Sequence, residues 1–141
     1  MIDICKIEDL YDILEALEEY NKDVSYSPWD INSATVSVEN LIKNDNVGFY
    51  KSVDNQGKID GLGCVLVVPQ ILDYTENKAI EAIFHSKHYR ILYKLLKEME
   101  IFAKSKKAKT ISFSINTRNT MQKFLEKNGY KLNEIVMIKE V

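Results

Sequence analysis

Residues 78–128 constrain the fold more than any other part of the chain. This run contains an apolar strand-like segment at 78–84, a helical pattern at 87–105, a β-rich segment at 110–115 and a second helical pattern. Apolar side chains within 87–105 recur at three- and four-residue spacing, which indicates a helix with one face in a core. A strand, a helix and a strand in this order predict two parallel strands joined by a crossover.

The rest of the chain adds strands and helices to this unit. Gly61 and Gly63, inside an apolar run, predict a bulge or a close backbone approach, and Gly129 fits the left-handed position that ends a helix. The predicted order of elements is β-α-α-β-β-β-α-β-α-β. This order predicts an α/β protein with a mixed sheet and helices on both faces of that sheet. We expect a single domain at 1–141. The additional elements are a strand at 1–6, helices at 7–20 and 34–43, a hairpin of 47–53 with 58–68, and the closing strand IVMIKEV.

Composition narrows the range of partners and the cellular compartment that we expect for this protein. Nineteen Lys and Arg against 21 Asp and Glu leave a net charge of -2, which gives no general reason to expect nucleic acid. Cys5 and Cys64 lie far apart in apolar runs and are interpreted as core residues in a reducing compartment. Because the chain also lacks a signal-like N-terminus and a long apolar run, we expect a cytoplasmic protein that does not span a membrane.

Positive charge gathers where the helix at 87–105 begins. Lys87, His88, Arg90 and Lys94 oppose the helix dipole there unless an anion is bound, so the pattern indicates an anion site. A solvated basic rim on an ordinary helix explains the same residues equally well.

Glu81 stands among apolar residues of the segment at 78–84. It is either a general base facing a cleft or a charged residue on a less covered face of the sheet. His85 and His88 are spaced like a pair, but no cysteine or carboxylate follows at a convincing spacing, so we expect no metal site.

With this order and these motifs, the chain resembles the GCN5-related N-acetyltransferase (GNAT) superfamily, particularly small divergent members carried by bacteriophages. The resemblance covers nearly the whole chain and is carried by IFHSKHYR, LLKEMEIFAKSKKAKTISFSIN and FLEKNGYK. In that family the pantetheine arm of acetyl-CoA lies between two splayed parallel strands, and its pyrophosphate lies at the N-terminus of the following helix. The resemblance therefore implies transfer of an acetyl group from acetyl-CoA to an amine of a small molecule or a protein.

The resemblance also implies roles for individual residues. Glu81 would be the catalytic base, and Tyr26 and Trp29 would border the acceptor pocket, although both aromatic residues would serve equally to pack their loop onto the sheet. Asn116 is expected near the pantetheine amides, or as a helix cap that needs no ligand. The full set of expected cofactor-binding residues is Ile83, Phe84, Lys87, His88, Tyr89, Arg90, Ile91, Asn116 and Phe124.

Two departures from the family pattern leave a second function open. Arg90 and Leu92 stand where the family's pyrophosphate loop has glycines, and Leu125 stands where many members have a tyrosine that protonates the leaving thiolate. Tyr130, Tyr89 or water would have to supply that proton. The alternative function is a catalytically inactive GNAT-fold protein, phage-encoded if the closer resemblance holds, that acts through protein–protein contact. IVMIKEV pairs either inside the monomer or across a homodimer.

Overall fold

A computed structural model of the chain describes residues 1–24, 29–72, 75–115 and 121–141. Its centre is a sheet in the order β1-β2-β3-β4-β5, in which β4 and β5 are parallel and all other neighbours are antiparallel. The predicted hairpin and the predicted parallel crossover are both confirmed. The strands are β1 Ile2–Ile4, β2 Val47–Val53, β3 Ile59–Pro69, β4 Asn77–Ser86 and β5 Ala108–Ser112.

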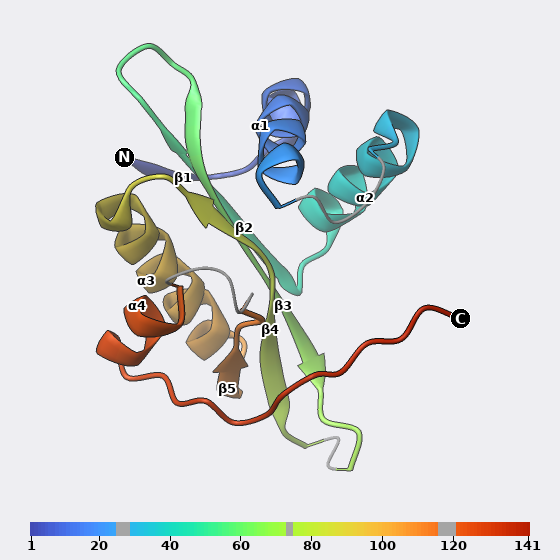
Figure 1. The fold of residues 1–141 in the computed structure, drawn as a ribbon, viewed down its shortest axis with the longest axis vertical. Coiled ribbons are helices and arrows are strands. Elements are labelled where there is room, and N and C mark those ends of the chain that lie inside the picture. Colours follow the sequence, from blue (N-terminus) through green and yellow to red (C-terminus); the bar gives the residue numbers. More distant parts are fainter. Residues whose placement is uncertain (25–28, 73–74, 116–120) are drawn as a thin grey trace.

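Helices cover both faces of the sheet (Figure 1). On one face lie α1 Leu10–Val24, which follows the 3-10 helix Ile7–Asp9, and α2 Ile31–Lys43; on the other lie α3 Tyr89–Ser105 and α4 Met121–Lys127. Each face has its own buried cluster, one centred on α3 and the other beneath α1 and α2. The predicted α/β class, with a mixed sheet between two helical layers, is therefore confirmed.

Glycines on β3 let α3 lie very close to the sheet. A Cβ atom at Gly61 would lie 2.6 Å from Ile91 Cγ2, and one at Gly63 would lie 2.9 Å from Met99 Sδ. The close approach predicted for Gly61 and Gly63 is confirmed, and it fixes where α3 begins relative to the ends of β3 and β4.

The closing strand predicted from IVMIKEV is wrong. Residues 130–141 form neither helix nor strand, and Figure 1 shows this segment running away from the helices after α4. Ile135 and Ile138 are 82% and 89% exposed. A β-rich sequence becomes a strand only where a partner strand accepts its hydrogen bonds, and this segment has none in the described chain. Its pairing across a homodimer stays a prediction.

Candidate functional site

The parallel strands β4 and β5 separate at Glu81. Their pairing runs from Asn77 to Ile80 on β4, and no later β4 residue pairs with β5 in the described chain. On the other side of β4, Cys64 and Val65 of β3 pair with Ile83 and Glu81, so one extra residue bulges from β4 between them. A bulge and a strand divergence therefore meet at the same position, and they open the sheet beside the Glu81 side chain.

The Glu81 carboxylate lies across this opening. Its Oε2 accepts a hydrogen bond from the backbone N–H of Ser114, 3.4 Å away, just beyond the end of β5. Burial raises the pKa of Glu81 to about 7, and the hydrogen bond from Ser114 opposes that shift only in part. A carboxylate that ionises near neutral pH is well suited to accept a proton from a substrate.

Aromatic rings pack side by side where the two strands diverge. The ring centroids of Phe84 and Phe113 lie 5.1 Å apart in an edge-to-face contact, and those of Phe84 and Phe124 lie 6.2 Å apart. Tyr89, at the start of α3, stacks on Phe124 of α4 at 5.8 Å. The structure thus brings together three predicted cofactor-binding residues, although Phe84 itself is buried in the core.

The first turn of α3 carries the predicted cationic cluster on its surface. Lys87, His88 and Arg90 are exposed, the first turn contains no acidic residue, and the His88 side chain makes no cap hydrogen bond. The Ser86 hydroxyl fixes the junction, because it donates to the Asp60 carbonyl at 2.7 Å and accepts from the His88 N–H at 3.2 Å. An uncapped helix N-terminus with exposed cations can bind an anion.

Two of the three residues that depart from the family pattern have structural roles. Leu92 and Leu125 are 3% and 5% exposed and lie in the core, so neither side chain projects from the surface at the start of α3. Tyr130 donates its hydroxyl proton to Glu100 Oε1 at 3.0 Å, and burial together with the Glu100 charge raises the pKa of Tyr130. Tyr89 is 56% exposed at the helix start, so of the two tyrosines it is the more accessible.

The other predicted residues are scattered. Ile83 packs against the cluster beneath α1 and α2, Ile91 packs against the α3 cluster, and Trp29 is half-buried against the α1 and α2 cluster. Trp29 thus serves as packing in this structure. Tyr26 and Asn116 lie outside the described residues, and their roles stay predictions.

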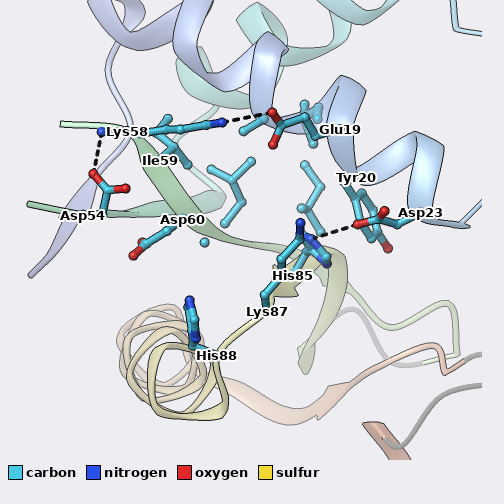
Figure 2. A pocket seen from close by; sticks show the side chains of 15 residues that line it. Glu19, Tyr20, Asp23, Asp54, Lys58, Ile59, Asp60, His85, Lys87 and His88 are labelled. Atoms are coloured by element: carbon cyan, nitrogen blue, oxygen red, sulfur yellow. Dashed lines mark hydrogen bonds and ion pairs between the residues drawn. The ribbon is translucent and has the colours of Figure 1, made fainter. Parts of the chain in front are cut away.

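A cavity that the sequence reasoning missed lies between α1 and the ends of β3 and β4 (Figure 2). Its volume is about 170 Å³. Tyr20 and Asp23 of α1, Asp60 of β3 and His85 of β4 line it, together with Lys87 before α3. The only local signal in the sequence was a carboxylate, Asp60, within the otherwise apolar β3 run.

Across the described ranges, no group of three or more His, Cys, Asp or Glu side chains is arranged to hold a metal ion. Among the helices of the same residues, none combines the length and apolar character needed to cross a membrane.

No protein-family model and no curated protein matches this sequence. Solved structures do match its fold. A transcriptional regulator from Bacillus halodurans C-125 superposes with a TM-score of 0.84 at 15% identity, over 100% of this chain and 99% of that chain. A predicted acetyltransferase with acetyl-CoA from Clostridium acetobutylicum gives 0.79 at 12% identity, over 99% and 96%. Glucosamine-6-phosphate N-acetyltransferase from Arabidopsis thaliana gives 0.77 at 15% identity, over 99% and 97%.

The TM-scores establish the fold of the chain. The sequence identities are too low to establish its reaction. The chain has the fold of the GNAT acetyltransferases, as the sequence motifs predicted, and the structural neighbours include several acetyltransferases. The closer resemblance to bacteriophage members stays a prediction. The function of this chain depends on the chemistry of its own site residues and not on the fold alone.

Proposed function

We propose that this protein is an acyl-CoA-dependent N-acetyltransferase that transfers an acetyl group to an amine of a small molecule or a protein. The position of Glu81 supports this function most directly: a carboxylate with a pKa raised to about 7 lies where the parallel strands β4 and β5 separate. An anion-compatible helix start follows the same strand. The fold shared with acetyltransferases supports the same reaction class.

The residues present fit acetyl-CoA at two points. Exposed Lys87, His88 and Arg90 at the uncapped start of α3 would hold the diphosphate by charge and by main-chain N–H groups. The edge of β4 beyond Ile80, which has no β5 partner in the described chain, leaves main-chain groups for an extended arm that carries amides. When bound, acetyl-CoA supplies the thioester.

Glu81 would act on the acceptor amine. Its carboxylate takes the proton that the amine loses, directly or through one water, as the new C–N bond forms and the C–S bond breaks. The thiolate that leaves needs a proton in return. Accessible Tyr89 or water would supply it, because the Tyr130 hydroxyl is bonded to Glu100. Orientation contributes most of the acceleration, since a neutral amine is already a good nucleophile.

Calorimetry with acetyl-CoA tests this proposal directly. We expect saturable binding below millimolar concentration, and we expect Arg90→Glu to weaken it by about tenfold, because a charge-assisted hydrogen bond is replaced by repulsion. Lys104→Glu, an exposed reversal in the last turn of α3, is the matched control and should leave the affinity unchanged. No binding at millimolar acetyl-CoA would overturn the enzyme proposal and leave the inactive binding protein as the better account. Equal affinities for both variants would exclude the start of α3 as the diphosphate site.

A further inference from the structure

Two parts of the chain that are suited to strand pairing have no strand partner in the described structure. The first is the β5 edge, residues 108–115, because β5 is the last strand of the sheet and pairs on its β4 side alone. The second is the C-terminal segment, residues 131–141, which forms no strand. This segment exposes four consecutive apolar side chains, Ile135, Val136, Met137 and Ile138. A free strand edge and an exposed apolar β-rich segment both favour association, and each supplies the partner that the other lacks.

The two sequences fit one antiparallel register. Residues 108–115 read AKTISFSI, and residues 134–141 read EIVMIKEV. The register that sets Lys109 opposite Glu140 gives an opposite-charge pair. On the same face it pairs Ile111 with Ile138 and Phe113 with Val136, and on the other face it pairs Ser112 with Met137 and Ser114 with Ile135.

Neighbouring registers fit less well. A shift of one residue sets Lys139 opposite either Lys109 or Ile111. A shift of two residues sets a glutamate opposite either Phe113 or Ile111. Like charges in opposite positions are destabilising, and a charge opposite an apolar side chain loses a favourable cross-strand contact. The sequence of the C-terminal segment therefore matches the β5 edge at one register.

This register also extends a buried face of the sheet. Ile111 and Phe113 are half-buried against the cluster centred on α3, whereas Val136 and Ile138 are exposed. Pairing would set these four side chains next to one another. The apolar surface removed from water in this way stabilises the pairing.

The start of the C-terminal segment favours pairing with a second copy over pairing with its own chain. Tyr130 is held in place, because its ring centroid lies 5.3 Å from that of Phe113 and its hydroxyl donates to Glu100. Own-chain pairing would require residues 131–133 to leave Phe113, pass Ile115 and reverse direction, without a glycine or proline. A segment that continues outward needs no reversal, and Figure 1 shows it leaving the body of the molecule. A short hinge of this kind favours the exchange of an element between copies.

Reciprocal exchange gives an interface of suitable size. Each copy would contribute the eleven residues 131–141 and the eight residues 108–115. A standard interface takes roughly 20–30 residues a side, so the exchanged segments and edges approach that size. Each copy would use both its segment and its β5 edge, so the assembly closes at two copies.

We propose that this protein forms a homodimer in which residues 134–141 of each copy add an antiparallel strand to the β5 edge of the other copy. The match between the unpaired edge and the unpaired segment at one register supports this dimer most directly. The dimer goes beyond the proposed acetyl transfer. Ile135 of the second copy would lie opposite Ser114, whose N–H donates to Glu81, so each copy would support the strand end beside the carboxylate of the other.

Light scattering of the purified protein tests the dimer. We expect a mass twice the 16.3 kDa of the chain, and a monomeric wild type would overturn the proposal. Lys109→Glu should weaken the dimer by about tenfold, because it replaces an attractive pair by a repulsive one at two symmetric places, and adding Glu140→Lys should restore it. Lys104→Glu, an exposed reversal in the last turn of α3, is the matched control and should leave the dimer unchanged. Equal dimer stability in Lys109→Glu and the wild type would exclude this register.

A pair of cysteines distinguishes exchange from own-chain pairing. Ser112 and Met137 are exposed and opposite in the proposed register, whereas the native Cys5 and Cys64 are buried. When Ser112→Cys and Met137→Cys are combined in one chain and oxidised, exchange gives a disulfide between two chains on a non-reducing gel. A disulfide within one chain would show own-chain pairing and would overturn the proposal. Ser112→Cys combined with Asn55→Cys, at an exposed position in the β2–β3 turn, is the control and should give neither product.

A longer hinge tests why the segment would exchange. Insertion of Gly-Ser-Gly-Ser after Asn133 allows the segment to reverse, and own-chain pairing then gains from its higher effective concentration. We expect the mass to fall to that of one chain and the cysteine pair to close within it. A lengthened chain that remains fully dimeric would contradict the hinge argument. Because acetyl-CoA is absent from these measurements, the dimer and the acetyl-transfer proposal can fail separately.

Discussion

Glu81 and Asp60 lie on neighbouring strands of one sheet, yet their carboxylates have opposite surroundings. Glu81 stands at the divergence of β4 and β5, where burial raises its pKa to about 7 and the Ser114 N–H donates a hydrogen bond to its carboxylate. Asp60 shares a polar cavity with Asp23, Lys87 and His85. A carboxylate with a raised pKa is suited to exchange a proton, whereas the cavity gathers side chains of both charges. The two sides of β4 therefore differ in their electrostatic surroundings, and proton transfer is expected on the β5 side.

The largest expected effect is the loss of proton transfer at Glu81. Glu81→Gln keeps an oxygen for the Ser114 N–H but cannot accept a proton, so we expect kcat/KM to fall by about 10²- to 10⁴-fold. The measurement is thiol release from acetyl-CoA with the best acceptor from a panel of primary amines. Acetyl-CoA affinity by calorimetry should stay unchanged. Glu134→Gln, at an exposed position after α4, is the matched control.

The pH dependence of the rate and of the stability, compared between the wild type and Glu81→Gln, sharpens this test. The wild-type rate should rise with pH through about 7, because only ionised Glu81 accepts a proton. Stability should show the opposite trend. The folded pKa lies above the unfolded value of 4.5, so the wild type loses stability between about pH 4.5 and 7, and Glu81→Gln lacks that loss. Its size is of the order of 1–3 kcal/mol. A rate that is independent of pH in this range would exclude Glu81 as the base.

The sequence predicted the structural surroundings of Glu81 better than it predicted the cavity, for physical reasons. Glu81 interrupts an apolar strand, and the strand–helix–strand order alone places it beside a parallel neighbour. The cavity depends on how α1 packs across β3, which brings Asp23 and Asp60 to opposite walls of one cavity although 37 positions separate them in the sequence. Local patterns carry no information about such packing. They also predicted a strand at IVMIKEV, because β propensity does not report whether a partner strand is available.

A smaller effect is expected at Gly61, where β3 lies against the first turns of α3. In Gly61→Ala the new Cβ would lie 2.6 Å from Ile91 Cγ2 and 3.1 Å from Leu95 Cδ1, so α3 must shift. We expect a stability loss of about 1–3 kcal/mol by denaturant titration, together with weaker acetyl-CoA binding. Gly63→Ala meets the flexible Met99 sulfur at 2.9 Å and should lose less stability. An unchanged stability in both variants would mean that α3 can move away from β3 without cost.

The smallest expected effect is at the exposed ion pair beside the cavity. Lys58 and Glu19 have side chains that are 55% and 52% exposed, so Lys58→Met should leave Tm nearly unchanged. Lys97→Met breaks the Lys97–Glu100 pair of α3, whose side chains are 41% and 22% exposed, and should lower Tm by no more than a few degrees. Thermal unfolding at low and at high salt checks both variants. Because salt screens exposed charges, the small difference between each variant and the wild type should shrink further at high salt. A large loss of Tm in Lys58→Met would mean that the lysine stem, and not the ion pair, packs against the sheet.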